Sequence, residues 1–284
     1  MSKASKLRAL LAGDDFLMMP CCFDGLSAAL IERAGYPLTF MSGFSVSAAR
    51  LGMPDTGLIS YGEMVDQGRS ICQATALPVI GDGDTGYGNA LNVKRTVQGY
   101  AQAGFAGIMI EDQLSPKRCG HTKGKQTVGF DEACMRIQAA VDARNEGADI
   151  LIMARTDARQ TEGLDEAIRR MKAFEKIGAD ILFLEAPQSV EEMTLFCQEV
   201  KGAKMANMVE QGKTPVLPPE QLAEMGYKIA AYPLTLILSA IQAMETALEE
   251  LKSGYHPKSL ASFEHLQEVI GFPAYYQNEE RYKT

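Results

Sequence analysis

Short apolar segments alternate with longer amphipathic segments along most of the chain. The apolar segments are continuous instead of alternating with polar residues, which is typical of strands buried on both faces of a parallel sheet. We expect strands at residues 16–20, 38–42, 77–82, 107–112, 150–156, 181–186, 204–209 and 228–234.

The segments between these strands have helical periodicity. In residues 89–104, 131–147 and 164–178, for example, apolar side chains recur at helical spacing and leave charged side chains on the other face. Several of these segments end in a glycine just before the next strand, where glycine can adopt the left-handed conformation that terminates a helix. This alternation predicts an α/β fold, a (β/α)₈ TIM barrel, although an open doubly wound sheet would have the same pattern.

Two further helical segments, residues 239–254 and 256–272, exceed what the barrel needs. We therefore expect a single barrel domain over residues 1–284, with residues 239–284 as a C-terminal helical extension. The extra helices could pack on a neighbouring subunit or fold back on their own barrel.

The composition and charge argue against several classes of protein. The net charge of -8, without a basic stripe, argues against nucleic-acid binding. The longest nearly apolar stretch, residues 229–244, is short for a bilayer and is interrupted by Pro233 and Gln242, so no membrane partner is expected. The N-terminus lacks the features of a secretory signal, and the six cysteines have no C-x-x-C spacing, which together favour reduced thiols in the cytoplasm.

The segment "GDGDTGYG" at residues 81–88 satisfies the G-x-G-x-x-G pattern of a dinucleotide-binding turn. That pattern alone is a weak signal, and here Asp82 and Asp84 fill two of its open positions. A phosphate-binding turn points backbone N–H groups at an anion, and a carboxylate about 4 Å from a like charge costs about 4 kcal/mol at an effective dielectric of 20. The two aspartates therefore favour a metal site.

Polar side chains follow most of the other expected strands as well. They are Ser42, Asp55, Asp82, Asp84, Glu111, Asp112, Arg155, Asp157, Glu185 and Asn207. In a parallel barrel the active site lies at the carboxyl ends of the strands, so these side chains should converge. Clustered carboxylates suit Mg²⁺, which keeps several waters and takes one or two carboxylates directly.

The segment between residues 111 and 130 is long for a connection that follows a strand, and it carries four basic residues. It could be a solvated basic loop. It could also be a lid that closes over an anionic substrate and excludes water. Cys119 lies between its basic residues, a setting that suits a thiolate or a proton donor.

At this point the chain resembles the isocitrate lyase/phosphoenolpyruvate mutase superfamily. The resemblance covers nearly the whole chain, in "MSGFSVSAARLGMPDTG" (41–57), "GDGDTGYGN" (81–89), "IEDQLSPKRCGH" (110–121), "ARTDA" (154–158), "LEAP" (184–187) and "ANMVEQGKTP" (206–215). It implies a (β/α)₈ barrel, a Mg²⁺ cofactor with Mn²⁺ as the alternative, and a homotetramer in which C-terminal helices are exchanged between subunits.

The same resemblance implies roles for individual residues. Asp82 matches the direct metal ligand, and the carboxylates that hold the metal's waters match Asp55, Asp84 and Glu111. Cys119 matches the acid that protonates the departing carbanion, and we expect Cys119, Arg155 and Glu111 to act in catalysis.

The resemblance also implies positions that bind substrate. By this resemblance, the segment Ser42, Gly43 and Phe44 would receive the α-keto acid carboxylate, with Arg155 beside it. The positions that hold the carboxylate of the other product match Gly120, His121 and Asn207, and Glu185 matches a residue of the substrate pocket.

Cys119 favours the C–C lyases of the superfamily, because relatives that act on P–C bonds usually lack this cysteine. Thr122 and Lys123 replace the Arg-Pro of typical methylisocitrate lyases, so the chain is also similar to 2,3-dimethylmalate lyase, the petal-type lyases and carboxyphosphonoenolpyruvate mutase. Pro233 stands where oxaloacetate-hydrolysing relatives typically have serine. We therefore expect a lyase that splits a di- or tricarboxylate of the 2-methylisocitrate or 2-alkylmalate type into pyruvate or glyoxylate and a carboxylic acid. The alternatives are a carboxyphosphonoenolpyruvate mutase, an oxaloacetate hydrolase or decarboxylase, a nucleotide-dependent oxidoreductase and a non-catalytic barrel.

Overall fold

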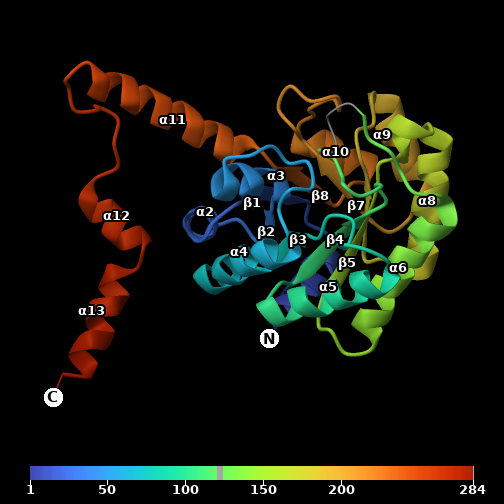
Figure 1. The fold of residues 1–284 in the computed structure, drawn as a ribbon, viewed down its shortest axis with the longest axis horizontal. Helices are drawn as coiled ribbons and strands as arrows, with labels where there is room; N and C mark the ends of the chain where they lie inside the picture. The colour runs from blue at the N-terminus through green and yellow to red at the C-terminus, as the bar shows by residue number, and fades with distance from the viewer. Residues whose placement is uncertain (120–123, 284) are drawn as a thin grey trace.

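The computed structural model describes residues 1–119 and 124–283, and its strands form one closed parallel barrel in chain order (Figure 1). The strands are β1 (Leu17–Cys22), β2 (Thr39–Met41), β3 (Val79–Asp82), β4 (Gly107–Glu111), β5 (Leu151–Thr156), β6 (Ile181–Leu184), β7 (Ala203–Asn207) and β8 (Ile229–Tyr232). β8 pairs with β1 and closes the sheet. The predicted barrel is therefore confirmed, and the open doubly wound sheet is wrong.

Most of the helices surround the barrel, and those after the last strand extend away from it. They are α1 (Lys3–Ala12), α2 (Gly25–Arg33), α3 (Gly43–Val46), the π-helix η1 (Ser47–Leu51), α4 (Tyr61–Ala74), α5 (Ala90–Ala103), α6 (Phe130–Asn145), α7 (Ala158–Thr161), α8 (Leu164–Ile177), α9 (Val190–Glu199), α10 (Pro219–Met225), α11 (Thr235–Lys252), α12 (Phe263–Val269) and α13 (Phe272–Arg281). α5, α8 and α10 end at Gly104, Gly178 and Gly226, whose φ angles of 100°, 110° and 102° lie in the left-handed region, as the sequence predicted.

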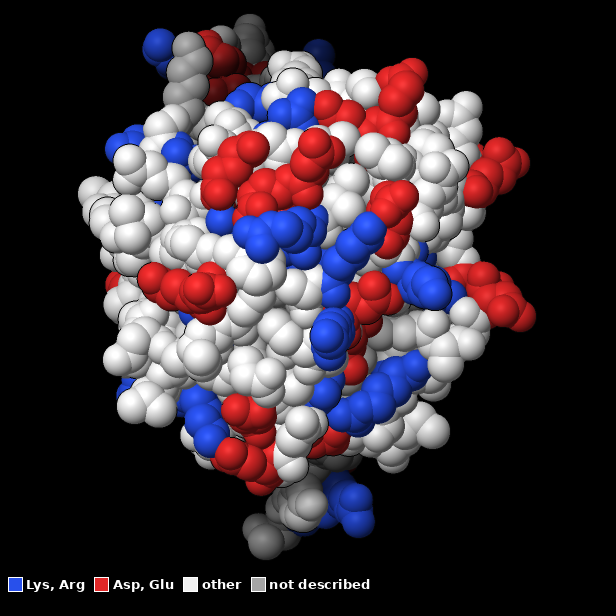
Figure 2. All heavy atoms as spheres, turned by 90° about the vertical axis from the view of Figure 1, so that its right-hand side faces the viewer, with Lys and Arg blue, Asp and Glu red and all other residues white. Residues whose placement is uncertain are grey.

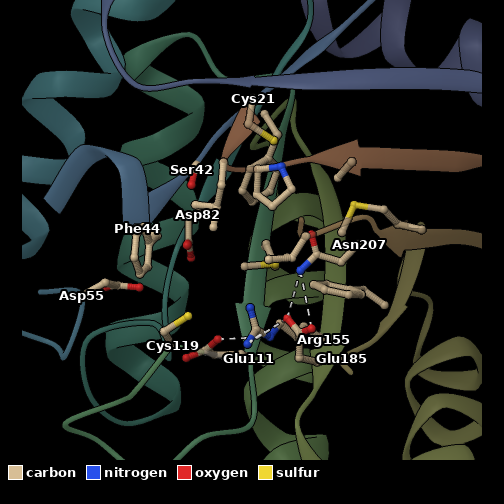
Figure 3. A pocket seen from close by; sticks show the side chains of 18 of the residues that line it. Cys21, Ser42, Phe44, Asp55, Asp82, Glu111, Cys119, Arg155, Glu185 and Asn207 are labelled. Atoms are coloured by element: carbon tan, nitrogen blue, oxygen red, sulfur yellow. Dashed lines mark hydrogen bonds and ion pairs between the residues drawn. The ribbon is translucent and has the colours of Figure 1, made fainter. Parts of the chain in front are cut away.

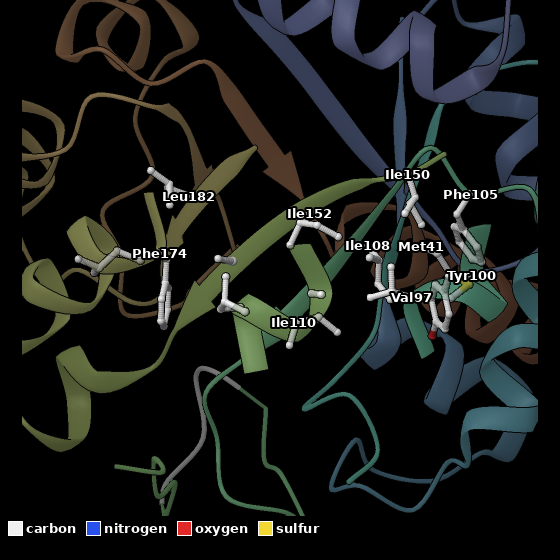
Figure 4. Packing of buried hydrophobic residues seen from close by; sticks show 14 of the residues in the cluster. Met41, Val97, Tyr100, Phe105, Ile108, Ile110, Ile150, Ile152, Phe174 and Leu182 are labelled. Atoms are coloured by element: carbon white, nitrogen blue, oxygen red, sulfur yellow. The ribbon is translucent and has the colours of Figure 1, made fainter. Parts of the chain in front are cut away.

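The apolar core has two layers. One fills the barrel interior and includes Met19, Met153 and Phe183. The other lies between the sheet and the helices, where Ile110 and Phe174 are among the side chains drawn in Figure 4. Apolar side chains on both faces of each strand explain why the strands read as continuous apolar segments.

The C-terminal helices leave the barrel. Figure 1 shows α11, α12 and α13 as an arm that extends away from the sheet instead of folding back over it. None of the described residues in α12 and α13 is buried, and their exposed side chains include Phe263, Leu266 and Tyr275. The arm begins at Thr235, four residues before the predicted extension.

The surface carries charges of both signs (Figure 2), and the described helices are not of the membrane-spanning kind. Acidic and basic side chains are interspersed on the face drawn in Figure 2, where no basic stripe appears. None of the helices in residues 1–119 and 124–283 combines the length and the apolar character that crossing a bilayer requires.

Candidate functional site

A cavity of about 230 Å³ opens at the carboxyl ends of the strands (Figure 3). Nine of the residues expected in the site line it: Ser42, Phe44, Asp55, Asp82, Glu111, Cys119, Arg155, Glu185 and Asn207. Gly43 and Asp84 adjoin it, because the Gly43 N–H donates to Asp82 Oδ2 (3.3 Å) and the Asp84 N–H donates to Asp82 Oδ1 (3.0 Å). Gly120 and His121 lie outside the described residues.

The turn at residues 81–88 is built for packing and for presenting Asp82. A Cβ on Gly81 would lie 2.6 Å from the Phe105 ring, and a Cβ on Gly83 would lie 2.6 Å from the Met109 carbonyl oxygen. Tyr100 donates from its hydroxyl to the Asp82 carbonyl (2.7 Å) and holds the end of β3. The glycines are therefore required by close contacts with neighbouring elements.

The next helix also differs from a dinucleotide-binding helix. The N-terminus of α5, which would face a pyrophosphate, is capped by the Asn89 side chain, which accepts hydrogen bonds from Leu91 N and Asn92 N (3.0 and 3.2 Å). The contacts at this turn therefore argue against the nucleotide-binding alternative.

Three aspartates gather around one lysine, and we call Asp55, Asp82, Asp84 and Lys117 the aspartate cluster. Lys117 Nζ lies 2.6 Å from Asp55 Oδ1 and 2.9 Å from Asp84 Oδ1, and all four side chains are buried. Burial, followed by the repulsion of Asp84, raises the pKa of Asp82 to about 6, although Lys117 opposes the shift. One ammonium therefore compensates three carboxylates incompletely.

Glu111 adds a fourth acid beside this cluster. Burial raises its pKa well above the ordinary value, against the attraction of Arg155, and its Oε1 atom is buried with no hydrogen-bond partner. Within the described part of the chain, no three His, Cys, Asp or Glu side chains are close enough to coordinate an ion by themselves. The residues therefore fit a hydrated Mg²⁺ with few direct protein ligands better than a fully dehydrated ion.

A second group, the arginine cluster, consists of Arg155, Asp157, Lys125, Glu111 and Glu185. Arg155 donates to both oxygens of Asp157 (Nε–Oδ2 2.9 Å, Nη2–Oδ1 3.0 Å), and its guanidinium lies 3.3 Å from Glu111 and 3.2 Å from Glu185. Burial opposes the ionisation of Asp157, but Arg155 and Lys125 outweigh it and hold its pKa below the usual range. The paired charges fix the guanidinium at the wall of the cavity (Figure 3).

Asn207 and Glu185 meet at the ends of neighbouring strands. The Asn207 amide nitrogen lies 3.3 Å from Glu185 Oε2. Both side chains line the cavity, so strand pairing brings together two residues that the sequence separates.

The rest of the cavity wall is mainly apolar. Besides Lys117 and Arg118, it consists of Cys21, Phe40, Met109, Phe183, Met205, Val209, Ala231, Pro233 and Leu234. Burial raises the pKa of the Cys21 thiol well above its ordinary value, so this thiol is neutral. We call these residues the apolar wall; Pro233 is the one among them that the sequence analysis singled out.

Two of the basic residues in the described part of the loop after β4 are buried instead of solvated. Lys117 and Lys125 are 5% and 7% exposed, and Lys125 Nζ lies 2.6 Å from Asp157 Oδ1. The Gln113 side chain closes the loop by accepting from Arg118 N (2.9 Å) and donating to Arg118 O (2.8 Å). These contacts place Cys119 at the cavity, and Lys117 is the site residue whose role the sequence did not reveal.

Known proteins of similar sequence cover almost the whole chain. A model of the phosphoenolpyruvate phosphomutase family matches residues 7–252. The chain is 41% identical to 2,3-dimethylmalate lyase of Eubacterium barkeri, over 100% of the chain and 99% of that protein. It is 38% identical to a chloroplastic carboxyvinyl-carboxyphosphonate phosphorylmutase of Arabidopsis thaliana (99% and 85% covered) and 42% identical to 2-methylisocitrate lyase of Aeropyrum pernix (86% and 78% covered).

Solved structures share the fold over the same extent. Oxaloacetate acetylhydrolase with the inhibitor 3,3-difluorooxalacetate has a TM-score of 0.94 at 34% identity (98% of this chain and 96% of that one). A 2,3-dimethylmalate lyase also has a TM-score of 0.94, at 36% identity (99% and 95% covered). Phosphonopyruvate hydrolase with oxalate and Mg²⁺ has a TM-score of 0.88 at 28% identity (99% of both chains). The chain therefore belongs to the phosphoenolpyruvate phosphomutase family, as a lyase of the phosphoenolpyruvate mutase/isocitrate lyase superfamily.

Proposed function

We propose that the protein is a Mg²⁺-dependent lyase that cleaves a C–C bond of a 2-alkylmalate or 2-methylisocitrate type acid, such as 2,3-dimethylmalate, into pyruvate or glyoxylate and a carboxylic acid. The observation that carries this proposal is the placement of Cys119, the aspartate cluster and Arg155 around one cavity. A metal site, an anion-binding group and a proton donor are the three parts that such a cleavage requires.

Asp82 is the proposed direct ligand of Mg²⁺, with Asp55, Asp84 and Glu111 holding its waters and Mn²⁺ as an alternative ion. The raised pKa values of Asp82 and Glu111 support this assignment, because buried carboxylates in excess of nearby cations favour an added cation. When bound, the ion would act as a Lewis acid that stabilises negative charge developing on substrate oxygens.

Arg155 is the proposed partner of the keto acid carboxylate, together with the segment Ser42, Gly43 and Phe44. Ser42 caps α3 through Ser45 N (3.3 Å), so this segment is the start of a helix that lies beside Asp82. On the opposite side, Asn207 would bind the carboxylate of the second product, with Glu185 beside it in the substrate pocket. Gly120 and His121 are proposed for the same role by resemblance alone.

Cys119 is the proposed general acid. Cleavage leaves a carbanion on the departing carboxylic acid, and a thiol at the cavity wall can supply its proton. Arg155 and Glu111 are proposed to act with it, Arg155 by stabilising the substrate's negative charge and Glu111 by holding the ion's water. The proposed chemistry also needs a base for the hydroxyl proton.

The apolar wall supports a substrate with alkyl substituents. Phe183, Met205 and Pro233 face the same cavity as the charged clusters, so a carboxylate and a hydrocarbon group could be bound together. A phosphonate substrate or oxaloacetate would present no alkyl group to these residues. The carboxyphosphonoenolpyruvate mutase and the oxaloacetate hydrolase or decarboxylase are therefore second candidates, kept because relatives with related activities are similar in sequence or structure.

A homotetramer with exchanged C-terminal helices is the proposed assembly. On α11 the exposed apolar side chains Ile241, Met244 and Leu248 support it, because a helix in water with such a face has lost the burial that normally stabilises it. Removal of residues 239–284 should lower the mass measured by light scattering from four chains to fewer. A cytoplasmic location is proposed as well, supported by cysteines that are all thiols.

The function is tested with a panel of 2-hydroxy di- and tricarboxylates and Mg²⁺, monitored for pyruvate, glyoxylate and oxaloacetate. We expect turnover of a 2-alkylmalate or 2-methylisocitrate that is lost with a chelator and restored by Mg²⁺. Metal-dependent turnover of a phosphonate or oxaloacetate in preference to every alkyl hydroxy acid would replace the proposal with a second candidate.

A further inference from the structure

A buried arginine lies behind the site, outside the cavity. Arg170 of α8 is fully buried, and its Nη1 atom donates to Asp112 Oδ2 and to the Val128 carbonyl oxygen, both at 2.9 Å. The remaining nitrogens contact Glu166 (2.9 Å) and Glu162 (2.7 Å). A charged side chain without exposure is costly unless every donor is used, so the position of Arg170 is tightly determined.

Asp112 connects this arginine to the end of β5. Its Oδ2 atom accepts from Thr156 Oγ1 (2.5 Å), and its Oδ1 atom accepts from Asp157 N (2.8 Å). The carboxylate therefore fixes both the side chain of Thr156 and the backbone of Asp157. In turn, Asp157 holds two nitrogens of Arg155, so three steps of direct contact lead from α8 to the cavity wall.

The same group of residues holds the returning part of the loop after β4. Val128 N donates to the Asp112 carbonyl oxygen (2.9 Å), and the Val128 carbonyl accepts from Arg170. Lys125, three residues earlier in the loop, contacts Asp157. One buried network therefore determines both the orientation of the Arg155 guanidinium and the position of a loop segment beside the site.

We propose that Asp112 and Arg170 are positioning residues, which set the anion affinity of the site by fixing Asp157 and through it Arg155. This inference rests on the proposed role of Arg155 in carboxylate binding. Bidentate recognition of a carboxylate depends on the direction of the guanidinium plane, so a small rotation of Arg155 weakens binding even when its charge is retained. Neither Asp112 nor Arg170 lines the cavity, so neither contacts the anion itself.

The test measures the affinity of the intact protein for oxalate in the presence of Mg²⁺, by titration calorimetry, together with the affinity for Mg²⁺ alone. In Asp112→Asn the shape is kept, but an amide N–H₂ or a weaker acceptor now faces Arg170. We expect the Kd for oxalate to rise about tenfold or more, since supporting residues around a site typically change affinity tenfold to a hundredfold. The Kd for Mg²⁺ should stay within about twofold, because Asp82, the proposed direct ligand, is outside the network and Glu111 would hold only the ion's water. Thr156→Val, which removes one hydroxyl, should give a smaller rise and serves if Asp112→Asn does not fold.

The matched control is Glu166→Gln. It neutralises a different partner of the same arginine, but the amide oxygen can still accept from Arg170 Nε and the contacts of Asp112 stay in place, so oxalate affinity should be unchanged. In an Arg155→Lys background, Asp112→Asn should have almost no further effect, because both changes act through one guanidinium.

Three results would overturn the inference while leaving the proposed function in place. Asp112→Asn and Thr156→Val could bind oxalate as tightly as the wild type, or Asp112→Asn could have its full effect in the Arg155→Lys background. An equal loss of Mg²⁺ and oxalate affinity would instead indicate general damage to the fold. Failure of the wild type to bind oxalate would contradict the proposed function itself, and the inference with it.

Discussion

The aspartate cluster and the arginine cluster both consist of buried charges at the ends of the strands, but their charges are balanced differently. In the aspartate cluster one lysine faces three carboxylates, and the pKa of Asp82 is raised to about 6. In the arginine cluster Asp157 contacts both Arg155 and Lys125, and its pKa is held below the usual range.

The difference indicates two tasks. An excess of buried carboxylates is unfavourable until a cation joins them, so the aspartate cluster is suited to binding an ion. A carboxylate with two cationic partners is already compensated. Asp157 is therefore suited to fixing the orientation of Arg155, whose guanidinium is proposed to bind the substrate carboxylate. Burial alone does not distinguish a ligand site from a support; the number of cationic partners at each carboxylate does.

The largest effect is expected at the aspartate cluster. Asp82→Ala should abolish metal-dependent turnover, by about a thousandfold or more, because a Lewis acid contributes several kcal/mol to charge stabilisation. Turnover and Mg²⁺ binding are measured together, with the exposed Asp14→Ala as the control. An unchanged response to Mg²⁺ would show that this cluster is not the ion site.

A smaller loss of turnover is expected for a substitution of Cys119, which the loop after β4 places at the cavity. Cys119→Ser should reduce turnover on the order of a hundredfold, since serine is a weaker acid, and should leave Mg²⁺ affinity nearly intact. Cys134→Ser, on the outer helix α6, is the matched control and should behave as the wild type. Normal turnover in Cys119→Ser would remove this residue as the proton donor.

The arginine cluster should respond in stability as well as in binding. Asp157→Asn leaves Arg155 and Lys125 without their shared anion and should lower the free energy of unfolding by about 3 kcal/mol at pH 7. Because the pKa of Asp157 is lowered by folding, its contribution is present above the unfolded value near pH 4 and is lost as the pH falls below it. Urea denaturation at pH 7 and at pH 3 to 4 should therefore show a smaller difference from the wild type in acid. The exposed Asp165→Asn serves as the control, and a difference that grew in acid would contradict the assignment.

The smallest effect is expected for an ion pair outside both clusters. Lys172 and Glu199 lie 2.5 Å apart, with side chains 48% and 44% exposed. A double-mutant cycle to alanine should give a coupling of about 0.5 kcal/mol or less, weakened further by salt. A coupling energy of about the 3 kcal/mol expected for Asp157→Asn would contradict the view that burial makes an ion pair contribute more to stability.

Most of the fold could be predicted because a parallel barrel leaves a simple pattern. Strands covered on both faces read as continuous apolar segments, and the helices end at glycines such as Gly104 and Gly178 whose backbone requires them. The side chains at the strand ends could be predicted to converge for the same reason, since all the strands of such a sheet end at one face.

The pairing of those side chains could not be predicted. Lys117 reaches Asp55, 62 residues away, and the sequence gives its charge but not the direction of a long flexible side chain. The apolar wall was missed because Met205 and Phe183 read as ordinary core residues of their strands. Likewise, Asp112 and Arg170 come from separate parts of the chain, and only the packing of α8 against β5 and β6 brings them together.

The most direct test is a crystal structure of the protein with Mg²⁺ and oxalate. The account predicts the ion bound to the Asp82 carboxylate at about 2.0–2.1 Å, with oxalate between the ion and the Arg155 guanidinium. An ion bound elsewhere, or oxalate at the cavity with no metal near Asp82, would contradict it.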